Sequence, residues 1–240
     1  MEVTTDIIKL AGGAAIVLDL DTSADALPLR QLTQAADRAE DAPGSVVLLK
    51  LAGGALPEVP GGWPQGAGVH DVNKWERVLR RLERLPAAVI AAVDGPVDGP
   101  ALELLLAADY RIATPQTVIR PPFLGGEPWP GMLLHRLAQQ AGAAATRRIA
   151  LFGADIPAER ALSTGIVDEV VDAGELAAAL QTVVEAAGEV AGKELAIRRR
   201  LVLDATTTSF EESLGAHLSA CDRVLRRERA EGRAGERSAA

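Results

Sequence analysis

The sequence predicts an α/β protein in which a mainly parallel sheet is followed by a region of helices alone. Short apolar runs rich in β-branched residues alternate with helical patterns as far as residue 171. Parallel strands need long crossovers, which are usually helical and right-handed. After residue 172 every pattern is helical. Apolar residues make up 48% of the 240 residues but aromatic residues only 3%, so Ala, Leu, Val and Ile must fill the core.

The first half of the chain contains three apolar runs that predict buried strands. They cover residues 14–20, 45–51 and 87–93, and short runs of this kind are typical of strands covered on both faces. Residues 26–40, between the first two runs, have apolar side chains at helical spacing. Glycine and proline are frequent from 53 to 68, which predicts a loop.

Residues 73–85 have the clearest helical pattern. One face is apolar and the opposite face is cationic, as in a helix that covers a core. Pro86 ends the pattern. The apolar face consists of Trp75, Val78, Leu79, Leu82 and Leu85, and the cationic face of Lys74, Arg77, Arg80, Arg81 and Arg84.

The second half is predicted to be mostly helical. A short helix is expected at 100–108, and residues 111–119 carry one strand or a pair of strands. Residues 123–131 are rich in Gly and Pro and predict a loop. The remaining expected elements are a strand at 166–171, helices at 132–141, 143–152, 157–163, 175–190, 194–205 and 210–228, and a flexible tail at 229–240.

Charge and cysteine content argue against several classes of function. The chain has 25 Lys and Arg against 33 Asp and Glu, a net charge of −8, whereas nucleic-acid binding needs clustered cations. One cysteine cannot form an intrachain disulfide, which fits a reducing cytoplasm. No apolar run is long enough to span a membrane, and residues 1–9 lack the layout of a signal peptide. We therefore expect a soluble, cytoplasmic protein that binds neither nucleic acid nor membrane.

Residues 86–172 resemble the core of the crotonase family, the enoyl-CoA hydratases and isomerases. The family pattern is a proline and an apolar strand, then Asn-Gly-x-Ala-x-Gly-Gly-Gly-x-Glu-Leu, Cys-Asp-x-Arg-x-Ala and, later, Thr-Gly-x-x-x-x-Ala-x-x-Ala-x-x-x-Gly-Leu-Val. Many positions fit in register, with one short deletion after Gly131. The matching residues are Gly95, Gly99, Glu103, Leu104, Asp109, Arg111, Ala113, Pro130, Gly131, Gly153, Ala158, Ala161, Gly165 and Val167.

The resemblance implies the crotonase fold. This fold has a repeated ββα spiral core, here residues 1–172, and a C-terminal helical region for trimerisation, here residues 173–228. The resemblance also implies an acyl-CoA ligand and a homotrimer or hexamer. Coenzyme A would enter as part of the substrate, and no other cofactor and no metal is implied.

Several segments resemble one branch of this family more closely. They are NKWERVLRRLERLPA, WPGM, RLAQQAG and the C-terminal ELAIRR and TTTSFEESLGAHLSACDRVLRR. This branch is the crotonase-like auxiliary protein of 3,5-dihydroxyphenylacetyl-CoA biosynthesis in glycopeptide-antibiotic pathways. The resemblance implies a polyketide-derived CoA thioester that is dehydrated and aromatised. It also implies a type III polyketide synthase and other crotonase-like proteins as partners.

Chemistry in this family passes through a thioester enolate, whose oxygen is stabilised by two backbone N–H groups. By resemblance Ala67 is the first donor, in a glycine-flanked turn; the alternative is a plain surface turn. Pro100 stands where the family has the second donor, and proline has no N–H. The helix start from Gly99 to Ala101 either forms a shifted oxyanion site or has lost this function.

By the same register Glu103 is the acid/base glutamate. It lies on an otherwise apolar helix, where partial burial would raise its pKa. The alternative is a glutamate that stabilises the helix dipole. Phe123 stands where the second family glutamate would be, and Glu127 either reaches the site or is an exposed loop residue. We place the substrate pocket at Gly66, Gly68, Phe123, Glu127 and Trp129.

The remaining candidates have weaker support. His70 follows the donor turn and is either an acid/base group or a solvent-exposed or capping residue. His135 and His217 fall within helices, without metal-ligand spacing. Asp109 matches a structural aspartate of the family. Cys221 is expected to be a small buried side chain on the amphipathic helix 210–228.

Two functions are compatible with the sequence. One is a hydratase- or dehydratase-like lyase with Glu103 as its single acid/base, since a product that gains aromaticity needs less catalytic help. The rival is a non-catalytic acyl-CoA-binding or scaffolding partner of the synthase. Glu103 favours the enzyme, whereas Pro100 and Phe123 favour the rival.

Overall fold

The computed structural model separates into two compact units, residues 1–195 and 196–240. Most of the loop predicted at 53–68 lies outside the described residues, and only its end, from Trp63, is described. The structure describes residues 4–10, 13–21, 27–42, 44–52, 63–190 and 193–238.

The first unit is built on a six-stranded sheet with the strand order β1-β2-β3-β4-β5-β10. Strands β2 to β5 and β10 are parallel, and β1 is antiparallel to β2. The three predicted strands and the parallel topology are therefore confirmed. The strands are β1 (Thr4–Leu10), β2 (Gly13–Asp21), β3 (Val46–Ala52), β4 (Ala88–Asp94), β5 (Tyr110–Ala113) and β10 (Glu169–Val170).

Strand β1 was missed by the sequence analysis. Its residues Thr4, Thr5, Asp6 and Lys9 interrupt the apolar run that marks a strand covered on both faces. An edge strand needs fewer apolar residues because one of its neighbours is solvent. The strand forms because all its residues pair with β2, for example Ile7 with Ile16.

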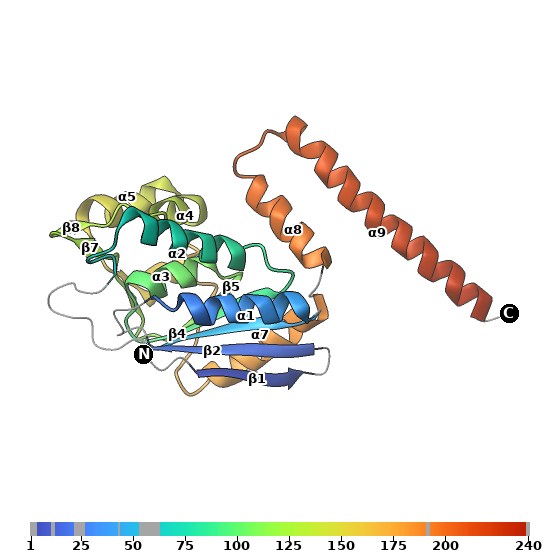
Figure 1. Ribbon diagram of the computed structural model, residues 1–240, viewed down its shortest axis with the longest axis horizontal. Coiled ribbons are helices and arrows are strands. Elements are labelled where there is room, and N and C mark those ends of the chain that lie inside the picture. Colours follow the sequence, from blue (N-terminus) through green and yellow to red (C-terminus); the bar gives the residue numbers. More distant parts are fainter. Residues whose placement is uncertain are drawn as a thin grey trace. The chain divides into compact units, whose positions relative to one another are not determined.

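Helices cover both faces of the sheet, which explains why its inner strands are apolar at nearly every position. On one face lie α1 (Leu29–Asp41), α2 (Val69–Leu82) and α3 (Gly99–Ala107); α7 (Leu176–Val190) covers the other (Figure 1). Alternate strand residues divide between the two cores. Val47, Leu49 and Leu51 face the three helices, and Val46 and Leu48 face α7.

Helix α2 begins at Val69, four residues before the start predicted from its apolar face. Asp71 explains the earlier start, because its side chain accepts a hydrogen bond from the amide of Gly68 at 3.1 Å. An acidic side chain in the first turn is favourable at this end of a helix. The predicted apolar face is confirmed: Trp75, Leu79 and Leu82 are fully buried.

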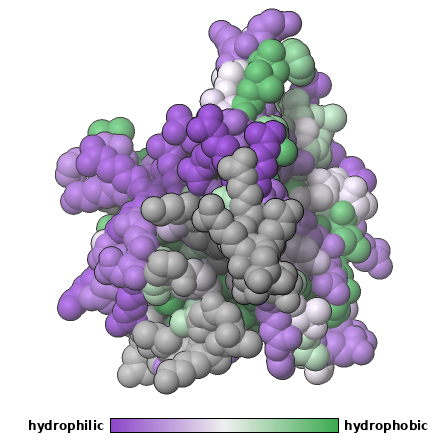
Figure 2. Space-filling model, turned by 90° about the vertical axis from the view of Figure 1, so that its right-hand side faces the viewer, coloured by the Kyte–Doolittle hydropathy of each residue, from purple (hydrophilic) through white to green (hydrophobic). Residues whose placement is uncertain are grey.

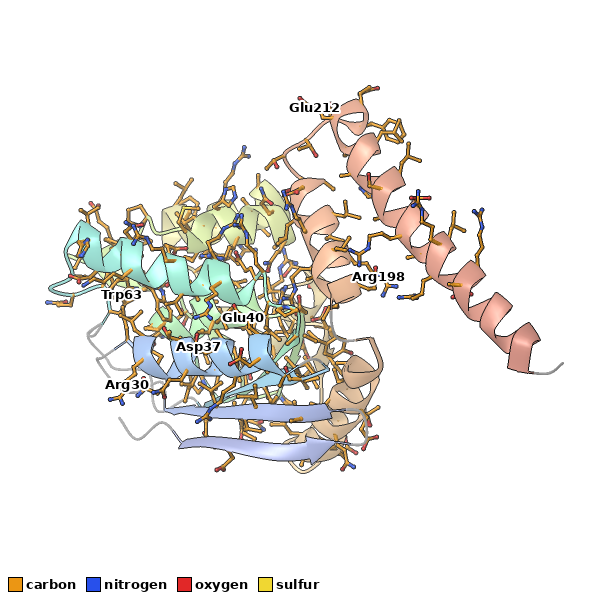
Figure 3. The ribbon with its side chains drawn as sticks, turned by 45° about the vertical axis from the view of Figure 1, so that its right-hand side comes forward. Arg30, Asp37, Glu40, Trp63, Arg198 and Glu212 are labelled. Atoms are coloured by element: carbon orange, nitrogen blue, oxygen red, sulfur yellow. The ribbon has the colours of Figure 1, made fainter. Side chains whose placement is uncertain are left out.

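An ion-pair group joins the predicted cationic face of α2 to α1. Arg81 donates hydrogen bonds to Asp37 at 2.6 Å and to both carboxylate oxygens of Glu40, at 2.9 and 2.8 Å. Asp37 and Glu40 are labelled on α1 in Figure 3. Because these side chains are partly exposed, solvent screens the interaction, and it contributes little to stability.

Two regions differ from the predicted elements. The expected loop at 123–131 contains a small hairpin, β7 (Phe123–Leu124) and β8 (Glu127–Pro128). Gly125 and Gly126 form its turn, and both have positive φ, which only glycine adopts without strain. The strand expected at 166–171 is shorter in the structure and consists of β10 alone. Ile166 and Val167 belong to no strand; they are apolar because they are buried in the core.

The remaining helices of the first unit agree with the predicted ones, whereas strand β9, which includes Pro157, was not predicted. The expected strand or strand pair at 111–119 consists of β5 and a separate short strand, β6, which pairs with β9. These remaining elements are β6 (Val118–Ile119), α4 (Leu133–Gln140), α5 (Gly142–Phe152), β9 (Ile156–Pro157) and α6 (Ala158–Ser163).

Helices form the second unit. It contains most of helix α8 (Lys193–Asp204) and all of α9 (Phe210–Ser238). Ser209 and Glu212 cap α9 reciprocally: the amide of Ser209 donates to Glu212 at 2.9 Å, and the amide of Glu212 donates to the Ser209 hydroxyl at 3.3 Å. We predicted that this helix ends at residue 228, but the structure continues it to Ser238.

Several apolar side chains of α9 are exposed within this unit. They recur at four- and seven-residue spacing and so share one face of the helix: Phe210, Leu214, Leu218 and Leu225. Cys221 is also exposed, so the prediction of a buried cysteine was wrong for the chain by itself. Among the residues that Figure 2 colours by hydropathy, most are hydrophilic, with separate hydrophobic patches. No helix within the described ranges combines the length and the apolar character that crossing a membrane requires.

The packing of β3 gives a test of this fold. Leu49 is completely buried between the sheet and its helices, whereas Lys50, the next residue, is exposed. We expect Leu49→Ala to lower the free energy of unfolding by about 2–5 kcal/mol, and Lys50→Ala to change it by less than about 0.5 kcal/mol. Urea denaturation measures both, and equal effects would contradict the burial of Leu49.

Candidate active site

Glu103 is the only charged residue of α3, and it is buried. The helix reads GPALELLLA, and its other side chains are apolar and pack into the core. Glu103 is only 1% exposed. Removing a carboxylate from water is costly unless it is protonated or hydrogen-bonded. Its neighbours therefore decide what Glu103 can do.

Trp75 is the principal hydrogen-bond partner of Glu103. Its indole N–H donates to Oε2 of Glu103, from α2 to α3. Trp75 is itself fully buried, on the apolar face that the sequence predicts. The alternative role for Glu103, stabilising the helix dipole, has no support, because the first turn of α3 contains no acidic residue.

Burial raises the pKa of Glu103 to about 7. The hydrogen bond from Trp75 opposes this effect, because it favours the anion, as does the charge of Arg136; the charge of Glu76 adds to it. A carboxyl group with a pKa near neutrality exchanges a proton readily in both directions. This property suits general acid–base catalysis, and it agrees with the prediction that burial raises the pKa of Glu103.

A buried ion-pair network lies between α2 and α4 and contains the two charges that influence Glu103. Arg136 donates two hydrogen bonds to Glu76, at 2.9 and 3.3 Å, and one to Glu83, at 2.7 Å. Arg80 donates to the other oxygen of Glu83 at 3.1 Å. The sequence analysis missed this network. The available signal was the seven-residue spacing of Glu76 and Glu83, which places both on one face of α2.

Trp63 is a second indole beside Glu103, and it too was missed by the sequence analysis. Its ring makes an edge-to-face contact with Trp75, with centroids 6.4 Å apart and an angle of 61° between the planes. The indole N–H of Trp63 also favours the anion of Glu103, but more weakly than Trp75 does. Its Nε1 is buried and has no hydrogen-bond partner among the residues that the structure describes. Figure 3 places Trp63 near the start of α2.

The start of α3 has the geometry expected of a helix with proline in its first turn. Gly99 has a φ of +44°, and the backbone oxygen of Trp63 would lie 3.5 Å from a side chain placed there. Pro100 is tolerated here, because the first amides of a helix have no partner within the helix. The Leu102 amide donates to the Asp98 carbonyl at 3.2 Å. For the amide of Ala101, the described part of the chain provides no acceptor.

The predicted donor Ala67 lies in a tight turn. Its amide donates to the carbonyl of Pro64 at 3.0 Å, and Gly66 within the turn has a φ of +73°. Gly68 is the residue that caps α2. To bind a thioester oxygen, Ala67 would have to share or break its hydrogen bond to Pro64. Its role as a donor stays a prediction.

The other residues predicted for the pocket lie on the β7–β8 hairpin or just after it. Phe123 is half-buried, and its ring packs against Gly153, where any side chain would overlap it. Trp129 is half-buried and folds over Gly131, while Glu127 is exposed. Among the described residues, neither Glu127 nor Trp129 takes part in the interactions around Glu103. Their place in a substrate pocket stays a prediction.

The relationship of the chain to known proteins agrees with this geometry. Residues 53–230 match the model of the enoyl-CoA hydratase/isomerase family. The chain is also 47% identical, over 219 residues, to a protein from Amycolatopsis orientalis named enoyl-CoA hydratase; the match covers 89% of this chain and 97% of that protein. The chain belongs to the enoyl-CoA hydratase/isomerase family. The resemblance to the crotonase family is thereby confirmed.

Solved structures of the family share the fold. An enoyl-CoA hydratase from Bacillus anthracis is 21% identical, with a TM-score of 0.77 over 97% of this chain and 94% of that chain. An enoyl-CoA hydratase/isomerase from Cupriavidus metallidurans is 19% identical, with a TM-score of 0.77 over 92% of this chain and 88% of that chain. The crotonase fold predicted from the sequence is therefore confirmed.

The family motif Asp-x-Arg has a structural role in this chain. The Val89 amide donates to Asp109 at 2.7 Å, which ties β4 to the turn before β5. The buried Arg111 donates to the carbonyls of Ala108, at 3.2 Å, and Ile166, at 3.0 Å. These bonds fix the segment before β10 to the sheet. The structural reading of Asp109 is confirmed.

The remaining candidates do not gather around Glu103. His70, His135 and His217 are all exposed. Within the described ranges no group of three or more His, Cys, Asp or Glu side chains has an arrangement that could hold a metal ion. A pocket of about 290 Å³ lies between α5, β9 and α6 and is lined by residues that include Arg148 and Arg160. It contains none of the predicted site residues, so we do not assign the site to it.

The buried Glu103 makes the stability of the protein depend on pH. Its pKa is about 7 in the folded protein against an ordinary value of 4.5, so between these values the folded state holds a proton that the unfolded state has released. Stability therefore falls as pH rises through this range, by on the order of 3 kcal/mol. Glu103→Gln should abolish this loss. Urea midpoints measured from about pH 5 to 8 check it, and parallel curves for the two proteins would contradict the raised pKa.

Proposed function

We propose that this protein catalyses the elimination or addition of water on a CoA thioester, with Glu103 as its single acid/base. The observation that supports this most directly is a buried carboxyl group, with a pKa of about 7, at the position of the family's acid/base glutamate. The relative from Amycolatopsis orientalis is named an enoyl-CoA hydratase. This name, with the family membership, favours a lyase.

One carboxyl group suffices for the elimination. In a 3-hydroxyacyl thioester, the carboxylate of Glu103 takes a proton from the carbon next to the carbonyl, and the electron pair passes to the thioester oxygen. The enolate returns this pair to form the C=C bond, and the C–O bond of the hydroxyl group breaks. Glu103 then gives its proton to the departing hydroxide, which leaves as water. The group thus ends as the carboxylate with which it began.

For the substrate, we propose a polyketide-derived CoA thioester that is dehydrated and aromatised to 3,5-dihydroxyphenylacetyl-CoA. The resemblance of the segments NKWERVLRRLERLPA and WPGM to that branch of the family supports this choice. The partners would be a type III polyketide synthase and other crotonase-like proteins, in the cytoplasm. Coenzyme A would be needed only as part of the substrate.

A second function, non-catalytic binding of acyl-CoA in support of the synthase, is favoured by three observations. Pro100 has no N–H to give to a thioester oxygen, and Phe123 stands in place of the second glutamate. The amide of Ala67 already donates to Pro64. On this alternative, Glu103 would be a buried structural group bonded to Trp75.

Replacing Glu103 separates the two functions. We expect Glu103→Gln to lower the rate of dehydration about a hundred- to ten-thousand-fold, because the amide cannot accept and return the proton. The measurement is product formation with the type III polyketide synthase present. Glu159→Gln, which changes an exposed glutamate of α6, is the matched control and should leave the rate unchanged. In the parent protein, the rate should rise with pH through about 7, since the carboxylate is the reactive form. Full activity of Glu103→Gln would support the non-catalytic role.

We also propose that the protein assembles as a homotrimer or hexamer through the apolar face of α9. Leu218 lies on this face and is 59% exposed, and burying such residues favours association. We expect Leu218→Asp to dissociate the assembly at micromolar concentration. Ala216→Asp, on the opposite face of the helix, should not. Light scattering measures the mass of each variant, and a monomeric parent would refute the proposal.

A further inference from the structure

The indole N–H of Trp63 is a buried donor without an acceptor. Trp63 is 8% exposed, and no hydrogen-bond partner for its Nε1 exists among the residues that the structure describes. Leaving such a donor unpaired lowers the stability of the folded protein. Buried polar side chains nearly always have a partner, so an unpaired one requires an explanation. A ligand that brings an acceptor is one such explanation.

Several contacts fix the place to which this donor points. The Trp63 ring packs edge-to-face on Trp75, the tryptophan that is hydrogen-bonded to Glu103. The Trp63 indole N–H lies close enough to the carboxyl group of Glu103 to favour its anion, but not in the geometry of a hydrogen bond. The backbone oxygen of the same residue lies against Gly99, at the start of α3. The unpaired donor, the acid/base candidate and the positive end of a helix therefore share one region.

The chemistry proposed above needs a donor in this region. When a proton leaves the carbon next to a thioester, negative charge develops on the thioester oxygen, and donors aimed at that oxygen lower the barrier. At the start of α3 the backbone supplies one amide without an acceptor among the described residues, that of Ala101. The amide of Ala67 donates to Pro64, the amide of Leu102 donates to Asp98, and Pro100 has none. The indole of Trp63 is free for this purpose.

We propose that Nε1 of Trp63 donates a hydrogen bond to the carbonyl oxygen of the bound acyl-CoA thioester, as a side-chain replacement for the donor that Pro100 lacks. Trp63 is then a catalytic residue, because it touches the atom on which charge develops. The assignment rests on the proposed function in one respect only: the ligand is a thioester. It predicts that the site distinguishes a thioester from a thioether that lacks the oxygen.

The variant that tests the proposal is Trp63→Phe, which removes the N–H but keeps an aromatic ring against Trp75. With crotonyl-CoA as the probe, we expect the hydration rate to fall about a hundred- to a thousand-fold, the usual effect of losing one oxyanion donor. The parent should bind butyryl-CoA several-fold more tightly than its thioether analogue by calorimetry. In Trp63→Phe this preference should disappear. A variant that keeps both the rate and the preference would overturn the proposal.

Trp75→Phe is the contrasting variant, because its indole is bonded to Glu103 rather than free. Losing that bond destabilises the Glu103 anion, so the pH profile of the rate should move upward. The preference for the thioester should remain. If Trp75→Phe abolished the preference and Trp63→Phe did not, the donor would be assigned to the wrong tryptophan.

Pro100→Gly provides a rescue, because it returns a backbone N–H to the start of α3. If Trp63 replaces that N–H, Pro100→Gly should restore more activity to Trp63→Phe than it adds to the parent. Equal effects in both backgrounds would count against the replacement.

If Trp63→Phe does not fold, the parent protein can still test the proposal. Its three tryptophan indole N–H resonances can be assigned with Trp75→Phe and Trp129→Phe, and only that of Trp63 should shift more with the thioester than with the thioether.

The outcomes separate this inference from the proposed function. If Glu103→Gln is inactive while Trp63→Phe behaves as the parent does, the function stands and the inference falls. If Glu103→Gln is fully active while Trp63→Phe loses the thioester preference, Glu103 is not the catalytic acid/base, but the contact between Trp63 and the thioester is supported. A parent that binds neither analogue would refute both.

Discussion

The hydrogen bond from the Trp75 indole to Glu103 is the interaction on which the site depends. It allows a carboxyl group to sit in a helix whose other side chains are apolar, since the donor partly replaces the water that burial removes. Burial still has the larger effect, and the pKa of Glu103 stays near 7. Stronger donors would lower the pKa of Glu103 further, and loss of the Trp75 donor would raise it. Burial, opposed mainly by the Trp75 indole and further by Arg136 and Trp63, gives the intermediate pKa that proton transfer in both directions needs.

This interaction requires α2 and α3 to be fixed against each other, and the doubly covered sheet achieves this. Both helices pack on one face of β2 to β4, and α7 covers the other face. Arg136 then joins α4 to α2 through Glu76 and Glu83. A buried network of this kind adds little net stability, but it restricts how the helices can shift. It also brings two opposite charges near Glu103, whose effects on its pKa oppose each other.

The parts of this structure that are periodic could be predicted from the sequence, and the parts that depend on single contacts could not. Strands β2, β3 and β4 are continuous apolar runs, so their burial on both faces is visible. Strand β1 carries polar residues at an edge and was missed, while Ile166 and Val167 looked like strand because they are buried. Glu103 was found because the family motif gives its register. Trp63 was not, because it lies in a loop without periodicity, and only the folded chain shows that its N–H is unpaired.

The two tryptophans beside Glu103 couple ligand binding to its basicity. Both Trp75 and Trp63 favour the anion of Glu103. When the N–H of Trp63 donates to a thioester oxygen, it no longer favours that anion, and the pKa of Glu103 rises. The carboxylate thus becomes a stronger base only when a substrate oxygen is in place. The same donor then stabilises the negative charge that grows on the oxygen as the proton transfers, so the substrate becomes more acidic as Glu103 becomes more basic. Pro100 removes the family's backbone donor at the start of α3, and such a donor would stabilise the oxygen without changing the effect of Trp63 on Glu103.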